Sequence, residues 1–272
     1  MNRVTASLVL YNTPQYQLVR LLESLEASSM RPELFIVDNS PVSMPPPPAA
    51  DWITYIRSER NWGYGAGHNI ALKRVLEYSD FHFVLNPDVY FGSFELERML
   101  TYVEQEATIG LLMPKVLYPD GSVQYLCKLL PTPFDLLIRR FLPSRFAWMM
   151  KKGRDKFELR FTGYTKEMDV PYLSGCFMLL RTEALKRVGL FDERFFMYPE
   201  DLDLSRRIHA EFRSVYFPGA TVVHDHARAS YRNWRSLWVH MTNMIKYFNK
   251  WGWVRDASRR RTNRETLARL RM

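Results

Sequence analysis

Short apolar runs alternate with helix-period patterns along the first third of the chain. The run Val4 to Leu10 reads as a buried strand, and Phe35 to Val37 as a second one. Between them Thr13-Pro14 supplies an N-cap and a proline at the first helical position. The helix that follows carries one apolar stripe at i, i+3, i+4 and i+7 spacing: Leu18, Leu21, Leu22 and Leu25. A strand, helix and strand in this order predict a parallel β-α-β unit.

The alternation continues after a run of four prolines. Its predicted elements are a strand at Trp52 to Ile56, a helix at Ala66 to Tyr78, a strand at Phe81 to Leu85, a helix with Leu96, Met99, Leu100 and Val103 on one side, and an apolar run at Leu111 to Val116. We therefore expect an α/β fold with a doubly wound, mostly parallel central sheet flanked by helices. In such folds the ligand lies beyond the carboxyl ends of the strands.

Three regions follow from these patterns. Residues 1–230 are predicted to form one catalytic domain, with a nucleotide-binding half at 1–115 and an acceptor and catalytic half at 116–230. Within the second half, residues 128–166 mix basic with large apolar side chains and break the alternation, so they are interpreted as a basic insertion. Residues 231–272 are expected to be an amphipathic, basic helical appendage.

The net charge of +9 lies in that C-terminal region, because residues 231–272 hold eleven Arg or Lys against two acidic residues. A helical face there is predicted to carry Trp234, Leu237, Trp238, Met241, Ile245 and Phe248. Aromatic side chains beside arginines suit an anionic membrane surface. The alternative is a helix that packs on the catalytic domain, and both can hold for different faces of one helix. Nucleic-acid binding would use the same composition.

The sequence has no strong signal for a disulfide framework, an export signal or a membrane span. Cys127 and Cys176 are far apart and lack metal-site spacing. The first apolar run stops at Asn12, and no stretch approaches the ~18 apolar residues of a spanning helix. We expect a cytoplasmic protein that associates peripherally with the inner face of the cell membrane.

Polar residues follow three of the predicted strands: Tyr11-Asn12, Asp38-Asn39-Ser40 and Asn86-Pro87-Asp88. All three are expected to meet in one crevice. An acidic residue at a strand end suits a hard divalent cation, although Asp88 as a simple turn cap is an equal alternative. A glycine-rich segment from Asn61 to Asn69 opens a helix, where backbone amides approach a ligand closely.

Two further motifs lie in the second half. Glu200, Asp201 and Asp203 crowd the first turn of a predicted helix beside aromatic residues, which favours a general base over simple helix-dipole pairing. His224-Asp-His226 follows an apolar strand, and a strand-end histidine either ligates a metal or is structural. The spacing does not decide between these two histidines as the ligand.

In order and spacing these motifs resemble the family 2 glycosyltransferases of GT-A fold, and within them the bacterial rhamnosyltransferase-like group. The resemblance covers Val4 to about Ser230. It implies that Asp88 and His224 bind Mg²⁺ or Mn²⁺ and that Asp201 is the catalytic base, with Asp203 as a reserve. It also implies that the nucleotide-sugar is bound by Tyr11, Asn12, Asp38, Asn39, Asn61, Gly65, Asn69, Asn86, Gly175 and Glu200.

The implied activity is inverting, metal-dependent transfer of one sugar from a nucleotide-diphosphate donor. The favoured donor is dTDP-L-rhamnose, and UDP-galactofuranose or a UDP-hexosamine are alternatives. The expected acceptor is a lipid-linked glycan or a growing cell-surface polysaccharide. Nucleic acid is not an expected partner, because nucleic-acid binding would not explain the acid-rich constellation at Asp88 and Asp201. A basic nucleic-acid-binding protein remains the alternative from a different functional class.

Overall fold

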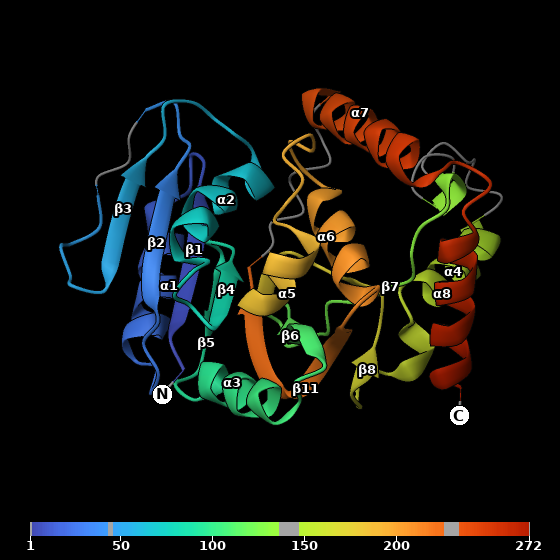
Figure 1. The fold of residues 1–272 in the computed structure, drawn as a ribbon, viewed down its shortest axis with the longest axis horizontal. Coiled ribbons are helices and arrows are strands. Elements are labelled where there is room, and N and C mark those ends of the chain that lie inside the picture. The colour runs from blue at the N-terminus through green and yellow to red at the C-terminus, as the bar shows by residue number, and fades with distance from the viewer. Residues whose placement is uncertain (1, 43–45, 136–146, 226–233, 272) are drawn as a thin grey trace.

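The computed structural model describes residues 2–42, 46–135, 147–225 and 234–271 (Figure 1). The strands are β1 (Val4–Leu10), β2 (Glu33–Asp38), β3 (Ile53–Arg57), β4 (Phe81–Leu85), β5 (Val89–Phe91), β6 (Ile109–Leu117), β7 (Cys127–Lys128), β8 (Met168–Asp169), β9 (Tyr172–Leu173), β10 (Phe177–Arg181) and β11 (Arg213–His224). The helices are α1 (Gln15–Glu26), α2 (Tyr64–Val75), α3 (Glu95–Gln105), α4 (Ala147–Phe157), α5 (Thr182–Val188), α6 (Glu200–His209), α7 (Trp234–Trp251) and α8 (Ala257–Arg269).

One sheet of nine strands organises the described residues, in the order β3-β2-β1-β4-β10-β6-β11-β5, with β8 paired to β11. Strands β3, β2, β1 and β4 are parallel neighbours, which confirms the predicted alternation of parallel strands and helices. The second half is mixed, because β10 runs antiparallel to both β4 and β6. Since β10 enters the sheet from the end where the parallel strands finish, the turn that precedes it, Ser174-Gly175-Cys176, lies at their carboxyl ends.

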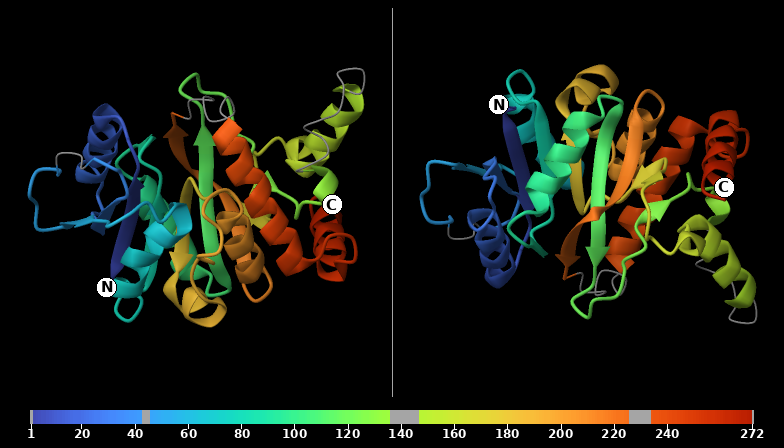
Figure 2. Two further views of the ribbon diagram at one scale, coloured as in Figure 1. Left: turned by 90° about the horizontal axis from the view of Figure 1, so that it is seen from above. Right: turned by 90° about the horizontal axis from the view of Figure 1, so that it is seen from below.

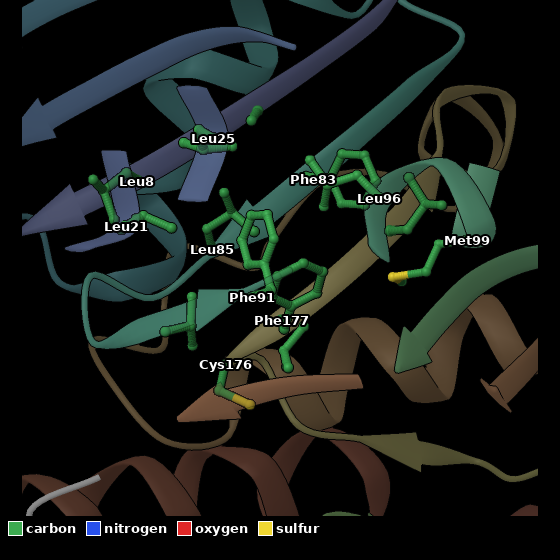
Figure 3. Close-up of a cluster of buried hydrophobic side chains, with 14 of the residues drawn as sticks. Leu8, Leu21, Leu25, Phe83, Leu85, Phe91, Leu96, Met99, Cys176 and Phe177 are labelled. Carbon is green, nitrogen blue, oxygen red and sulfur yellow. The ribbon is translucent and has the colours of Figure 1, made fainter. Parts of the chain in front are cut away.

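Helices cover both faces of the sheet (Figures 1 and 2). Helices α1 and α3 lie on one face, and α2, α5 and α6 on the other. The residues of β1 show why both faces are covered. Ala6, Leu8 and Leu10 point into the core under α1 and α3, part of which Figure 3 shows. A period of two along the strand then turns its polar residues toward α2.

A buried hydrogen-bonded chain fills that second face. Ser7 Oγ lies 2.7 Å from His68 Nδ1 and 2.7 Å from His82 Nε2. His82 Nδ1 lies 2.7 Å from Thr5 Oγ1, which is 2.9 Å from Ser79 Oγ. Both histidines are fully buried, and burial lowers the pKa of His82 to about 3 and that of His68 well below its usual value. This series of hydrogen bonds therefore holds α2 on the sheet only while both imidazole rings are neutral.

Part of the predicted basic insertion belongs to the core. Leu129, Phe157, Leu159 and Tyr164 are buried in the cluster between the sheet and α6. The Tyr164 hydroxyl donates to the carbonyl oxygens of Cys127 and Glu158, both within 2.9 Å. The segment at 136–146 is outside the described residues. The described ends of the insertion are thus structural elements of the catalytic domain.

The C-terminal helices pack on the catalytic domain rather than standing apart from it. Met244, Tyr247 and Phe248 of α7 are buried, whereas Trp238 and Ile245 are 71% and 39% exposed. The predicted apolar face is therefore divided between two environments: Phe248 is buried, while Trp238 and Ile245 lie on the solvent side. The side chain of Trp234 and the predicted boundary at residue 230 lie outside the described residues.

Buried polar contacts hold these helices to α6. Arg206 pairs with Asp256 at 2.8 Å, and both side chains are almost fully buried. Asp256 also caps α8 by accepting from the Arg259 N–H. Breaking a buried pair by removing one partner leaves an uncompensated charge, which costs several kcal/mol. No helix among the described residues is long and apolar enough to cross a membrane.

We expect acid to destabilise the fold through the two buried histidines. Their folded pKa lies below the ~6.5 of an unfolded chain, so the folded state binds fewer protons. Their contribution is fully present above about pH 6.5 and is lost as pH falls toward 3, at about 1.4 kcal/mol per pH unit for each histidine. Urea unfolding of the wild type and of His82→Gln between pH 7.5 and 4.5 measures this. The variant should lose stability less steeply with acid, and parallel slopes would contradict the assignment.

Candidate active site

Asn86 and Asp88 lie at the carboxyl end of β4, between β10 and β11. The Asn86 N–H donates to the Cys176 carbonyl oxygen at 3.0 Å, and the Asp225 N–H donates to the Asp88 carbonyl oxygen at 2.8 Å. These two backbone bonds connect the Asn-Pro-Asp turn to the start of β10 and to the end of β11. As a result Asp88 faces His224, the last residue of β11, although the two residues are 136 positions apart in the sequence.

Gln124 fixes the orientation of the His224 imidazole. The Gln124 amide nitrogen donates to the carbonyl oxygens of His224 at 2.7 Å and Leu117 at 3.2 Å, so its oxygen is turned to His224 Nδ1, 3.0 Å away. An amide oxygen only accepts, and Nδ1 therefore carries a proton. The other ring nitrogen, Nε2, points at Asp88 Oδ1 at 3.2 Å and at the Asn86 amide at 3.4 Å.

The Asp88 and His224 pair requires a cation. In a neutral imidazole with its proton on Nδ1, Nε2 is an acceptor and would face a carboxylate oxygen with nothing between them. Burial alone lowers the pKa of His224, but the thiol of Cys176 and the Asp88 carboxylate outweigh it and raise the pKa to about 10. Without a metal, a proton fills the gap. A divalent metal ion would take the same place, with a neutral Nε2 and a carboxylate oxygen as its ligands.

These donors fit a divalent metal whose remaining positions come from a substrate. Imidazole and carboxylate suit Mn²⁺ and Mg²⁺. Among the described residues, no three His, Cys, Asp or Glu side chains gather closely enough to hold a metal by themselves. His226, the other predicted candidate, is outside the described residues. The expected assignment of Asp88 and His224 is therefore compatible with the geometry and stays a proposal.

Asp201 begins the second part of the site, in the first turn of α6. Its Oδ2 accepts from the Gly175 N–H at 2.9 Å, and its Oδ1 from the Leu202 N–H at 2.7 Å and from the Tyr172 hydroxyl at 3.5 Å. Gly175 is needed for this contact, because a Cβ there would stand 3.1 Å from the Asp201 Cβ. The turn Ser174-Gly175-Cys176 thus brings β10 onto the acidic motif.

Glu200 and Asp201 are both buried, at 4% and 9% exposure. Burial raises the pKa of Glu200 well above its usual value, and the neighbouring Asp201 charge adds to the rise. Burial also raises the pKa of Asp201, opposed by the Gly175 N–H, Lys128, the Leu202 N–H and Tyr172. The donors stand around Asp201, whereas Glu200 Oε2 has no hydrogen-bond partner. This asymmetry favours the proton on Glu200 and the negative charge on Asp201.

Tyr64 interacts electrostatically both with the acidic residues of α6 and with Asp88. Its hydroxyl donates to the Gly175 carbonyl oxygen at 2.5 Å. Burial raises the pKa of Tyr64 well above its usual value, and Cys176, Glu200, Asp201 and Asp88 each raise it further. A single phenol is therefore within electrostatic reach of both carboxylate groups. The sequence motif contained Tyr64 but gave no signal that separated it from its neighbours.

The glycine-rich segment serves packing. A Cβ on Gly63, whose φ is +85°, would lie 2.1 Å from the Phe196 carbonyl oxygen, and one on Gly65 would meet Phe191 and Glu200 within 3.2 Å. Asn61 accepts from the Gly63 N–H at 2.9 Å. Both ends of the Asn69 amide bind the backbone of Phe191, at 2.9 and 3.1 Å. This use of Asn69 is structural, and Gly65 sets the distance between α2 and the acidic helix.

The remaining predicted residues lie at the ends of β1 and β2. Tyr11 is half exposed, and Asn12 has a φ of +50° with its N–H donating to Ser40 Oγ at 3.0 Å. Asp38 is fully buried, and its oxygens accept from the Ser40 N–H at 2.9 Å and the Tyr55 hydroxyl at 2.6 Å. The Asn39 amide donates to the Gly63 carbonyl oxygen at 3.0 Å. Asp38 and Asn39 therefore have their polar groups bound within the fold at the carboxyl end of β2.

Asp203, the expected reserve base, has a structural role. It is fully buried, and its carboxylate pairs with Lys250 at 2.6 Å and Arg207 at 2.8 Å and accepts from the Trp251 indole at 2.8 Å. Three donors that come from α6 and α7 leave it facing away from Asp201. The structure thus favours Asp201 as the base.

A strand-end Asn-x-Asp motif, a histidine beside it and an acidic pair at a helix start together define a glycosyltransferase-type site on an α/β sheet. Two solved structures share the fold. GalNAc-T7, with UDP, GalNAc and Mn²⁺, superposes with a TM-score of 0.66 at 14% identity over 92% of this chain and 48% of that one. The mannosyltransferase PcManGT of Pyrobaculum calidifontis, with GDP-Man and Mn²⁺, gives 0.54 at 14% over 98% and 74%. The expected GT-A fold is confirmed, in a chain about half as long as GalNAc-T7.

Sequence comparison shows the family. Residues 45–244 match the family described as glycosyltransferase like family 2. An N-acetylglucosaminyl-diphospho-decaprenol L-rhamnosyltransferase of Mycobacterium tuberculosis is 30% identical over 239 residues, 81% of this chain and 76% of the relative. The rhamnosyltransferase WbbL of Escherichia coli K12 is 26% identical over 84% of this chain and 86% of its own. The chain belongs to glycosyltransferase like family 2, and it is a glycosyltransferase, as the resemblance implied.

We expect Gln124→Leu to weaken metal binding although Gln124 is not a ligand. Losing its oxygen frees the imidazole to rotate and to change tautomer, and loss of such a supporting contact lowers metal affinity on the order of 10–100-fold. Mn²⁺ binding followed by electron paramagnetic resonance, with UDP, dTDP or GDP present, measures this. Asp88→Ala should bind least, and Gln105→Leu, on the exposed end of α3, should bind as the wild type does. Unchanged Mn²⁺ affinity in Gln124→Leu would remove the basis for the site.

Proposed function

We propose that the chain transfers a hexosyl group, L-rhamnosyl from dTDP-L-rhamnose, onto a lipid-linked glycan with inversion and with a divalent metal. The observation that carries this proposal is that the turn at Gly175 binds both Tyr64 and Asp201, while Asp88 and His224 face each other at 3.2 Å at the other end of this turn's contacts with Asn86. One crevice then offers a buried base and a cation site on separate elements. Sugar transfer needs both, because the acceptor loses a proton while the diphosphate gains charge.

Each part of the site has a chemical task in this proposal. Asp201 Oδ2 has one backbone donor and retains a lone pair for the proton of the acceptor hydroxyl. When bound, the metal neutralises charge on the departing diphosphate. Asn86 and the turn at Gly175 line the donor between these groups, and Tyr11 and Asn12 lie on the nucleotide side. A base on the opposite side of the sugar from the diphosphate implies single displacement with inversion.

The donor follows from the relatives rather than from the geometry. Two relatives are named rhamnosyltransferases. This supports an L-rhamnosyl donor, and dTDP-L-rhamnose is the nucleotide-sugar proposed on the resemblance. UDP-galactofuranose and UDP-hexosamines stay alternatives, since an archaeal relative from Haloferax volcanii, 26% identical over 66% of this chain, is named a hexosyltransferase.

The acceptor side lies against α7. Asn243 of α7 accepts from the Phe196 N–H at 3.4 Å and donates to the Met197 carbonyl oxygen at 3.2 Å. The Tyr64 N–H donates to the same loop at the Phe196 carbonyl oxygen, 3.0 Å away. Tyr198, the next residue of the loop, has a φ of +88°, a strained backbone of the kind found at ligand sites. The loop that leads to Glu200 is thus held between α2 and α7.

The outer side of α7 supports a membrane-presented acceptor. Trp238 and Ile245 are exposed one above the other on a helix that lies at the end of the molecule where the parallel strands finish (Figure 1). Arg260, Arg261 and Arg264 of α8 are also exposed. Exposed apolar and cationic side chains suit an anionic leaflet, where each cation contributes about 1 kcal/mol. A cytoplasmic, peripheral position at the inner face of the membrane is part of the proposal.

A screen of nucleotide-sugars tests the proposed activity. dTDP-L-rhamnose with Mn²⁺ or Mg²⁺ should raise the melting temperature more than the UDP-sugars do and should be consumed with a lipid-diphosphate glycan acceptor, and excess EDTA should abolish both effects. Asp201→Asn should lower kcat on the order of 10²–10⁴-fold with donor affinity retained, while Asp51→Asn, on an exposed loop, should leave it unchanged. Turnover in excess EDTA, or loss of donor binding in Asp201→Asn, would refute the assignments.

We expect Trp238→Ser with Ile245→Ser to reduce binding to anionic vesicles and to leave folding intact. A truncation after Tyr231 is a poor test, because it would remove Tyr247 and Asp256 from the core. Cosedimentation with vesicles of phosphatidylglycerol and phosphatidylcholine measures binding, and Thr242→Ser on the same face is the matched control. Equal sedimentation of the double variant, or binding of duplex DNA with no binding to vesicles, would contradict a membrane surface.

A further inference from the structure

Lys128 lies on the short two-stranded ribbon formed by β7 and β9. None of the roles predicted from the sequence involves this lysine. It ends β7 and pairs in antiparallel register with Tyr172 of β9. The Lys128 ammonium stands 5.0 Å from the centre of the Tyr172 ring. Tyr172 is buried, and its hydroxyl donates to Asp201 Oδ1 at 3.5 Å. One residue pair thus carries a cation and a hydrogen-bond donor to the carboxylate.

The ribbon is fixed to the catalytic helix by more than this contact. Ser205 of α6 accepts from the Leu173 N–H at 3.4 Å and donates to the Leu173 carbonyl oxygen at 3.1 Å. Two residues after Leu173, the turn that follows β9 supplies the Gly175 N–H to Asp201 Oδ2. These contacts fix the backbone of the ribbon, and with it Tyr172, against the first turn of α6.

Burial opposes a negative charge on Asp201, whereas Lys128 favours it. Glu200 precedes it on α6 and carries a buried carboxyl, Tyr64 faces it from α2, and Tyr172 and Lys128 face it from β9 and β7. Burial raises the pKa of the Tyr64 phenol well above its usual value, and burial opposes charge on both carboxyls. Asp203 lies on the far side of α6 with its own cations. Lys128 supplies the positive charge that acts on Asp201.

We propose that Lys128, with Tyr172, is a positioning residue that keeps Asp201 ionised beside Glu200, so that the base works at neutral pH. Lys128 touches neither donor nor acceptor in this role. It stabilises the charged form of Asp201, and the proton of the pair stays on Glu200. The inference rests on the proposed role of Asp201 and adds to it the residues that select which of the two carboxyls is the base.

The pH profile of kcat/KM separates this role from a structural one. In Lys128→Met the acidic limb should move about one pH unit upward, since one charge at a partly exposed site is worth roughly that shift. On the acidic side of the limb kcat/KM would then fall about tenfold, whereas the plateau on its alkaline side would stay close to that of the wild type. Lys128→Arg should restore the limb, and Lys186→Met, on the exposed side of α5, should not move it.

Two results would overturn the proposal. A uniform loss of rate at every pH in Lys128→Met would mean that the lysine only holds the ribbon. An unmoved limb with a raised KM for the acceptor would mean that Lys128 binds the acceptor directly.

A measurement that needs no turnover keeps the proposal independent of the assigned donor. Lys128→Met, Asp201→Asn and the double variant form a cycle of melting temperatures at pH 7. If the two charges interact, the shifts will not add: Lys128→Met will lower the melting temperature less when Asp201 is already neutral. The cycle of Lys186→Met with Asp201→Asn should be additive. Additive shifts in the Lys128 cycle would refute the inference even if transfer from dTDP-L-rhamnose is found, and absence of any transfer would refute the proposed function alone.

Discussion

The burial of two adjacent carboxyl groups at the start of α6 is the constraint on which the rest of the site depends. Glu200 and Asp201 are removed from water by Gly65, Tyr64 and the turn at Gly175. Two charged carboxylates in such a place repel each other and are poorly solvated. The backbone donors at Gly175 and Leu202 serve Asp201 alone. The fold thereby gives two chemically similar side chains different surroundings, which favour the proton on Glu200 and the charge on Asp201.

The same need for an opposite charge governs the other half of the crevice. His224 Nε2 and Asp88 Oδ1 face each other at 3.2 Å, with the tautomer of the imidazole fixed by Gln124. A proton satisfies this arrangement in the absence of metal, so binding of a metal must displace it. Metal affinity should therefore rise as pH rises, because metal and proton compete for the same place. In each half of the site, the buried contacts therefore favour one charge state over the others.

Sequence patterns predicted the parts of this structure that depend on local periodicity. The β-α-β alternation through Leu85 and the strand-end positions of Asn12, Asp38 and Asp88 follow from apolar spacing and from the rule that ligands lie at carboxyl strand ends. The antiparallel entry of β10 did not follow, because pairing between strands far apart in sequence leaves no local signal. For the same reason Gln124 and Lys128 were missed: each acts on a residue more than 70 positions away.

Local patterns did not separate the two environments along α7. Trp238 and Phe248 both fit one helical stripe, yet tertiary contacts bury Phe248 beside Tyr247 and leave Trp238 exposed. Likewise the acidic motif left Asp203 as a reserve base behind Asp201, and the contacts of Lys250 and Trp251 from α7 give Asp203 a structural role. Helix α7, which binds the Asp203 carboxylate through Lys250 and Trp251, also exposes Trp238 and Ile245 on its outer side. The inner side of α7 also contacts the loop before Glu200 through Asn243. The same helix therefore joins the exposed Trp238 and Ile245 to the loop that leads into α6.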